Sequence, residues 1–130
     1  SDGVNELLIR LKDQIEEYTN FGYRCVGYGA AAKGMTLINA SGIQLDAVID
    51  DNPLKQGLYC PGTSIPVVSS NYIDQLSRDD HIIFVPLAWN FYNEIVAKIR
   101  AVRNNNWKDN EFGDGFLRYF PKIKTETYDN

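Results

Sequence analysis

The sequence predicts a single α/β domain with an open, mostly parallel β-sheet and helices on both faces. Short apolar segments alternate along the chain with amphipathic helical segments, as in a parallel sheet with helical crossovers. A glycine-rich turn at residues 27–32 joins the first strand to the following helix. The 130 residues are 44% hydrophobic, which suits one domain with a core that needs neither metal ions nor disulfides.

The first half of the chain contains two helices and two strands. Residues 3–19 carry apolar side chains at spacings of three and four, which predicts a helix that either packs on the sheet or connects to another domain. A strand over 23–27 follows, then a helix over 31–40 that ends at Gly42. Residues 45–50 alternate between apolar and polar and predict the second strand.

The second half continues the alternation. Residues 65–68 predict an edge strand, because Pro66 cannot donate a backbone hydrogen bond. Ser69 or Ser70 is expected to cap a short helix that ends near Leu76. Residues 81–87 form the most apolar segment, which is typical of a strand buried on both faces.

The last part of the chain is expected to contain one helix and one strand. Asn90 is predicted to cap a helix that runs to Arg103, with three side chains facing the core: Ile95, Ile99 and Val102. A polar loop over 104–115 leads to a last strand over 116–120, and the chain after Pro121 is expected to fray.

These elements predict a Rossmann-like sheet of five strands in the order 3-2-1-4-5. In that order the first and fourth strands are neighbours whose carboxyl ends open a ligand crevice. We assign residues 1–22 to an N-terminal helix that packs on or leads into the domain, 23–122 to the Rossmann-like domain, and 123–130 to a polar tail.

Composition excludes several classes of partner. Seventeen acidic residues against thirteen basic ones give a net charge of −4, and no basic stretch occurs, so we expect neither nucleic-acid nor membrane binding. No apolar run approaches the ~20 residues of a membrane helix, and the given sequence does not open with a signal-peptide pattern. The two cysteines form no C-x-x-C or Cys/His cluster, which predicts no metal site and a reduced, cytoplasmic protein. Because the chain starts with Ser1 and not Met, we expect an excised or processed piece.

The turn Gly27-x-Gly29-x-x-Ala32 satisfies the requirements of a dinucleotide loop. Such a loop needs a tight turn, a close backbone approach to phosphate and a small residue where helix and strand pack. Asp50 and Asp51 follow Gly27 by 23 and 24 residues, near the spacing of roughly 20 for an acid that binds a ribose diol. The alternative is that the glycines only make a tight turn.

Lys33 and Gly34 lie in the first turn of the helix after this loop. A lysine there opposes the helix dipole by up to about 1 kcal/mol, which favours a bound phosphate, although a solvated lysine explains it equally well. Glycine inside a helix costs about 1 kcal/mol relative to alanine, so Gly34 indicates a close approach, either by a ligand or by another element such as a helix.

Two further groups of residues are candidates for ligand contact. Trp89 and Asn90 follow the most apolar strand and face the predicted crevice, where Trp89 is either a stacking surface or a core lid. Asn52 and Lys55 lie in a Pro/Gly-containing loop for which turn formation is the favoured interpretation. No Ser/His/Asp or Cys/His set can be assembled, and His81 lies at the opposite end of its strand, so we assign no catalytic residue.

Three motifs in order carry a resemblance to a known family. Residues 27–39 (GYGAAAKGMTLIN) resemble the GYGASAKGNTLLNY stretch in the C-terminal domain of sugar C-methyltransferases. Residues 51–67 resemble that family's D-N-P-x-K-Q-G-x-Y-x-P-G-T-x-I-P-V pattern, and residues 87–95 its LAWNF..EI pattern. The resemblance covers residues 4–122, with Ala31 and Met35 in place of a more common Ser and Asn.

The resemblance implies a binding role within a larger enzyme. Full members resemble three-part proteins with a Cys-rich zinc domain, a domain for S-adenosylmethionine and this last domain. The nucleoside-diphosphate sugar lies between the last two parts, so the methyltransferase domain is a partner in cis or in trans. No cofactor is expected in this chain, which should not transfer methyl groups alone. We expect the ligand to contact a set from the motifs: Gly27, Tyr28, Gly29, Ala30, Lys33, Asp50, Asp51, Asn52, Lys55, Trp89 and Asn90.

Two other functions remain open from the sequence. One is a freestanding, non-catalytic binding or regulatory module for a different nucleotide such as NAD, with Asp50 or Asp51 on the ribose. The other is an interaction domain without a ligand, in which the apolar stripe of the first helix is the interface. A weaker resemblance to the nucleotide-sugar domain of sugar N-acyltransferases indicates the same ligand class as the first reading.

Overall fold

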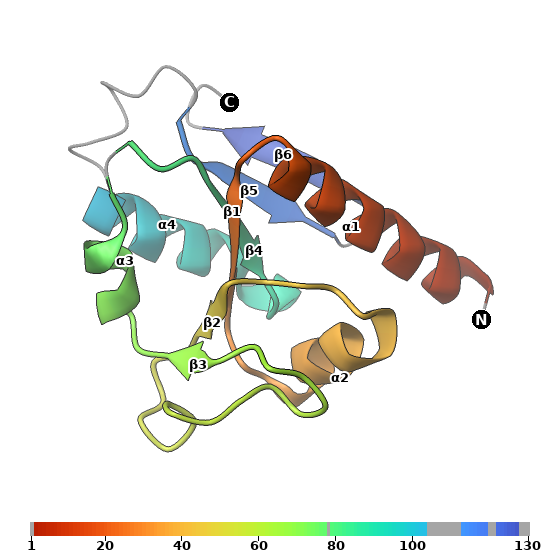
Figure 1. The fold of residues 1–130 in the computed structure, drawn as a ribbon, viewed down its shortest axis with the longest axis horizontal. Coiled ribbons are helices and arrows are strands. Elements are labelled where there is room, and N and C mark those ends of the chain that lie inside the picture. The colour runs from red at the N-terminus through yellow and green to blue at the C-terminus, as the bar shows by residue number, and fades with distance from the viewer. Residues whose placement is uncertain (1, 78, 104–112, 120–121, 128–130) are drawn as a thin grey trace.

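A computed structural model describes residues 2–77, 79–103, 113–119 and 122–127 (Figure 1). Its helices are α1 (Asp2–Asn20), α2 (Ala32–Ser41), α3 (Asn71–Gln75), the 3₁₀ turn η1 (Trp89–Phe91) and α4 (Tyr92–Arg103). Its strands are β1 (Arg24–Tyr28), β2 (Ala47–Ile49), β3 (Val67–Val68), β4 (Ile82–Pro86), β5 (Gly115–Arg118) and β6 (Lys124–Thr127).

The six strands form one mixed sheet in the order β3-β2-β1-β4-β5-β6. The pairs from β3 to β5 are parallel, and β6 pairs antiparallel with β5. The expectation of a five-stranded sheet is therefore wrong by one edge strand, and residues 124–127 do not fray. Their pairing covers the edge of β5, whose N–H and C=O groups would otherwise lack partners.

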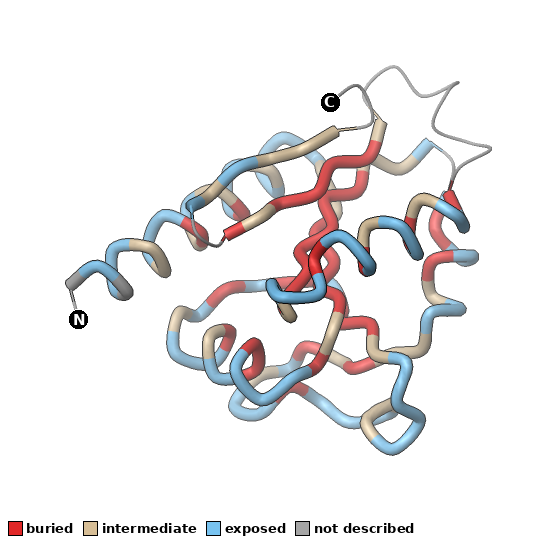
Figure 2. The backbone as a smooth tube through the Cα atoms, turned by 180° about the vertical axis from the view of Figure 1, so that it is seen from behind, coloured by how far each residue is buried: buried red, intermediate tan, exposed pale blue. Residues whose placement is uncertain are grey.

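Helices cover both faces of the sheet, as expected from the alternation. α1 and α2 contribute Leu11, Ile15 and Ile38 to the core on one face. α3 and α4 contribute Ile73 and Ile99, among others, to the core on the other face. Figure 1 shows the two helix pairs on opposite sides of the central strands, and Figure 2 shows those strands as the buried centre of the fold.

The first helix packs on the sheet through the stripe that the sequence predicted. Leu11 is fully buried and Ile15 is 2% exposed, and both belong to the same core as α2. The Tyr18 hydroxyl donates a hydrogen bond of 2.7 Å to Thr125 Oγ1, which links α1 to the added strand β6. Among the described residues, no helix is both long and apolar enough to cross a membrane.

Two details of the last helix differ from the sequence prediction. Asn90 does not cap α4, because it lies inside η1 and the helix begins at Tyr92. Val102 is 47% exposed and does not face the core, whereas Ile95, Ile99 and Arg103 are buried. Those three residues recur every four positions and so share one helix face. Val102 lies about 100° from Arg103 around the helix and only about 20° from Ile95, so its exposure does not follow from spacing alone.

Arg103 forms a buried ion pair that joins the end of α4 to the start of β5. Its Nε lies 2.8 Å and its Nη2 lies 2.9 Å from the two carboxylate oxygens of Asp114. The two side chains are 4% and 2% exposed. Two parallel hydrogen bonds of this kind offset the cost of burying both charged groups. Removal of either partner leaves the other charge buried without its counter-ion.

We expect Asp114→Asn to lower the free energy of unfolding by about 3–5 kcal/mol, because the Arg103 charge stays buried. Urea denaturation measures the change. Glu16→Gln is the matched control, because it removes the exposed Lys12–Glu16 pair, and it should change stability by less than about 0.5 kcal/mol. A loss for Asp114→Asn as small as that of the control would contradict a stabilising role for this ion pair.

Candidate functional site

The loop between β1 and α2 has the backbone that its glycines predict. Gly29 has a φ of 97°, a conformation that residues with a side chain rarely adopt. Its N–H donates to the Ile49 carbonyl at 2.7 Å, which ties the loop to the end of β2. A Cβ on Gly27 would lie 3.1 Å from side-chain atoms of Leu45 and Leu87, so the first glycine leaves space for the core.

Gly34 makes the close approach that its position in the helix predicted. A Cβ there would lie 2.9 Å from the Leu87 Cβ, so the neighbour is the residue after β4 and not another helix. Leu87 is fixed at both ends of its backbone: its N–H donates to the Tyr28 carbonyl at 2.9 Å, and its carbonyl accepts a hydrogen bond from the Tyr119 hydroxyl. Burial raises the pKa of Tyr119 to about 12, so this hydroxyl stays protonated and donates.

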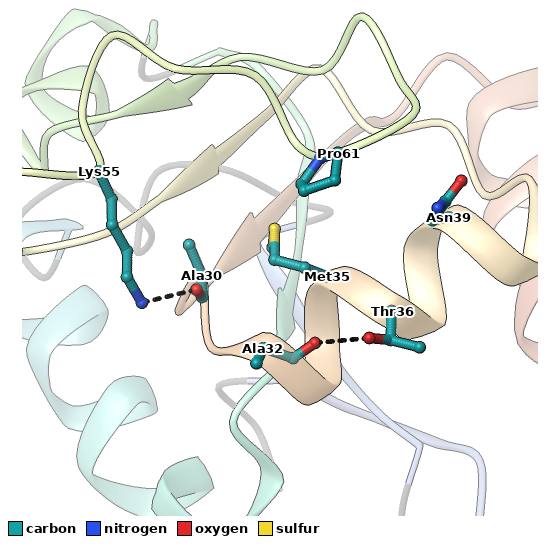
Figure 3. A pocket seen from close by; sticks show the side chains of 7 residues that line it. All are labelled: Ala30, Ala32, Met35, Thr36, Asn39, Lys55 and Pro61. Atoms are coloured by element: carbon teal, nitrogen blue, oxygen red, sulfur yellow. Dashed lines mark hydrogen bonds between the residues drawn. The ribbon is translucent and has the colours of Figure 1, made fainter.

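Ala30, in the middle of the loop, is held from both sides by the segment that follows β2. Its N–H donates to Asp50 Oδ2 at 2.6 Å, and its carbonyl accepts from Lys55 Nζ at 2.8 Å (Figure 3). The second carboxylate oxygen of Asp50 accepts the N–H of Asn52 at 2.8 Å. We call the contacts of Asp50 and Lys55 with Ala30 the clamp.

The buried Tyr28 and the exposed Asp51 form a second contact between β1 and the segment after β2. The Tyr28 hydroxyl lies 3.1 and 3.0 Å from the two carboxylate oxygens of Asp51, and Lys98 Nζ of α4 lies 3.1 Å from the second. Desolvation, followed by the Asp51 carboxylate, raises the pKa of Tyr28 well above its ordinary value. The two predicted ligand contacts thus bind each other in this structure.

Asn52 shapes the turn after β2. Its Oδ1 accepts the N–H of Leu54 at 3.0 Å, the hydrogen bond of an Asx turn. Gln56 Nε2 donates to the Asp50 carbonyl at 2.9 Å and closes the same turn. The favoured interpretation of this segment as a turn is confirmed in the backbone, and a ligand contact by Asn52 stays a prediction.

A pocket of about 400 Å³ lies between α2 and the segment that connects β2 to β3 (Figure 3). Two of its lining residues, Ala30 and Lys55, are in the set predicted from the sequence. The other lining residues were missed: Ala32, Met35, Thr36, Asn39 and Pro61. The helical residues among them come from one face of α2, and spacing alone does not show that a distant proline loop lies opposite that face.

The pocket combines an apolar surface with few polar groups, as small-molecule sites generally do. Met35 and Pro61 give apolar surface, and Thr36 and Asn39 bring a hydroxyl and an amide. The Thr36 hydroxyl donates to the Ala32 carbonyl at 2.9 Å, so its oxygen remains able to accept a hydrogen bond. The site can therefore hold a neutral, partly apolar group such as a base or a sugar.

The first turn of α2 borders this pocket and lacks the usual negative complement. Ala31 occupies the cap position without a side-chain hydrogen bond, and the first turn contains no acidic residue. The exposed Lys33 adds a positive charge at the positive end of the helix dipole. This combination favours an anion near the first turn of α2.

Trp89 and Asn90 lie at the carboxyl end of β4, in η1, and do not line the pocket. Trp89 is 42% exposed, which excludes a role as a buried core lid. The preceding residue, Ala88, lies with its Cβ 3.5 Å from the position that a Cβ on Gly29 would take. The end of β4 therefore reaches the glycine loop, on the β4 side of β1, whereas the pocket is formed by α2 and the loop after β2.

Comparison with known proteins identifies a matching family and a relative. The model of the family described as the C-methyltransferase C-terminal domain matches residues 1–108. The chain is similar to the C-methyltransferase NovU of Streptomyces niveus, with 31% identity over 103 residues that cover 74% of this chain. The matched part spans 24% of the length of that relative.

We expect Gly34→Ala to lower the free energy of unfolding by about 1–3 kcal/mol, because its Cβ would overlap with Leu87. Gly3→Ala is the matched control, since that glycine is also helical and nothing lies within 4 Å of its Cβ. The control should raise stability by up to about 1 kcal/mol. Denaturant unfolding measures the free energy of unfolding of both variants. If Gly34→Ala stabilised the protein as much as Gly3→Ala, the close approach of Leu87 to Gly34 would be contradicted.

Proposed function

The chain belongs to the C-methyltransferase C-terminal domain family, and from this premise we propose that it helps to bind the nucleotide-sugar substrate of a sugar C-methyltransferase. Methyl transfer would take place in a part of the enzyme outside this chain. The relative NovU supports this division, because its matched part is only 24% of its length.

The observation that carries the proposal is the pocket beside the first turn of α2. A nucleoside-diphosphate sugar has two negative phosphates flanked by a base and a sugar, both neutral and partly apolar. Lys33 and the N–H groups of the first helical turn suit the phosphates. The adjoining pocket of about 400 Å³ has the size and composition of a site for one of the neutral groups.

The role that these residues would perform is binding and orientation. S-adenosylmethionine, bound in another domain, would supply the methyl group. Contacts with the nucleotide lie far from the reacting carbon, yet their binding energy holds the sugar in a fixed orientation relative to the donor. The residues of this chain would thus increase the rate without taking part in bond making.

A second candidate is a non-catalytic NAD-binding module. The turn Gly27-x-Gly29 with Asp50 at the end of β2 favours it, because dinucleotide sites place an acid there for the ribose. The two candidates differ in the ligand that stabilises the chain.

A thermal-shift panel with dTDP, UDP, a dTDP-sugar, NAD and S-adenosylmethionine tests the proposal. A nucleotide at about 100 times its Kd should stabilise by about 2.7 kcal/mol, which raises Tm by several degrees for a domain of this size. We expect a shift with the nucleoside diphosphates and not with NAD or S-adenosylmethionine.

Lys33→Glu should abolish the shift, and Gly29→Val should abolish it together with the loop conformation. Lys124→Glu makes the same charge change on β6, at the far edge of the sheet, and should keep the shift. A shift with NAD alone would favour the second candidate. Absence of any shift with millimolar nucleoside diphosphates would contradict a binding site within this chain.

A further inference from the structure

We infer that Asp50 is a specificity-determining residue: its carboxylate fills the phosphate position of the glycine loop and excludes the diphosphate of a dinucleotide. The inference rests on the proposed function for the identity of the accepted ligand, a nucleoside-diphosphate sugar. The exclusion itself rests on the geometry of the clamp.

In a dinucleotide-binding loop the backbone near the second glycine approaches the pyrophosphate, and free N–H groups donate to it. Here the N–H directly after the second glycine, that of Ala30, donates to Asp50 Oδ2 at 2.6 Å. A hydrogen bond to an ionised carboxylate is short and strong. A ligand phosphate would have to displace it and would then lie against a like charge.

The position of Asp50 is fixed by contacts on every side. Its N–H donates to the Val68 carbonyl at 2.9 Å, which continues the pairing of β2 with β3. Its carbonyl accepts from Gln56 Nε2, and its second carboxylate oxygen accepts the Asn52 N–H. The backbone contacts fix the Cα of Asp50, and the carboxylate cannot turn away from the loop without the loss of its two hydrogen bonds, with the N–H groups of Ala30 and Asn52.

Lys55 completes the arrangement by binding the other backbone polar group of the same residue, the Ala30 carbonyl. Its Nζ donates to the Ala30 carbonyl at 2.8 Å and lines the pocket. The loop thus has one internal anion and one internal cation, both from the segment after β2. The remaining positive groups, Lys33 and the first turn of α2, lie after the loop in the chain and can accept a diphosphate that does not enter it.

The usual role of the acid after the second strand is to bind the ribose diol of a dinucleotide. In this chain that acid is committed to backbone N–H groups of the loop and its own turn. The residue that makes the sequence look like a dinucleotide site is therefore the residue that closes it.

Amide spectra of the ¹⁵N-labelled chain test the inference with sodium pyrophosphate and NAD as probes. In the wild type, a diphosphate bound at the first turn of α2 should move the Lys33 and Gly34 amide signals more than those of Ala30 and Asn52. In Asp50→Asn, pyrophosphate should cause saturable shifts at Ala30, with a gain in affinity of roughly tenfold or more, equivalent to about 1.4 kcal/mol. Asp74→Asn removes an exposed acid on α3 and should behave as the wild type.

A saturable shift of Ala30 in the wild type that exceeds the shifts of Lys33 and Gly34 would overturn the inference, and so would an unchanged affinity in a folded Asp50→Asn. If Asp50→Asn does not fold, Asp50→Ser is the second test variant. If neither variant folds, the titration of the wild type with pyrophosphate decides the inference. Addition of dTDP separates the two proposals. Failure of dTDP to bind contradicts the proposed function, while the pyrophosphate titrations still decide the role of Asp50.

Discussion

The carboxyl edge of the sheet depends on how the backbone of one residue, Ala30, is held. Asp50 binds its N–H and Lys55 binds its carbonyl, so the glycine loop and the segment after β2 form one structural unit. Leu87 sets the opposite boundary, because its side chain packs under Gly34 and its backbone pairs with β1. Between these two contacts the start of α2 has a fixed position, and the pocket lies against that helix.

Much of the fold follows from local patterns in the sequence. The alternation of apolar segments and helices predicts a parallel sheet, and the glycines at 27, 29 and 34 predict the tight turn and the close packing that the structure contains. The first helix packs through the stripe that its spacing predicts. Such features are readable because each depends on residues that are close in the chain or on backbone conformations that glycine alone adopts.

The sequence predictions are wrong where contacts between residues far apart in the chain determine the local structure. A polar segment after Pro121 becomes β6 because it completes the edge of β5, and its composition gives no signal of that need. Asn90 resembles a helix cap, but the chain makes a 3₁₀ turn before α4. The polar residues after β2 suggest ligand contacts, yet Asp50 and Lys55 bind Ala30 of the loop, and Asp51 binds Tyr28 at the end of β1, 20 to 25 residues earlier. Sequence spacing places such residues at one edge but does not show which groups pair with one another.

Native-state hydrogen exchange at Ala30 tests the clamp most directly. The Ala30 amide belongs to a loop at the edge of the domain, where unbonded amides exchange rapidly. The clamp predicts that it exchanges far more slowly than the amides of Ala32 and Lys33 in the uncapped first turn of α2, and that Asp50→Ala, which removes the acceptor, abolishes this difference. Equal exchange at Ala30, Ala32 and Lys33 in the wild type would contradict the account.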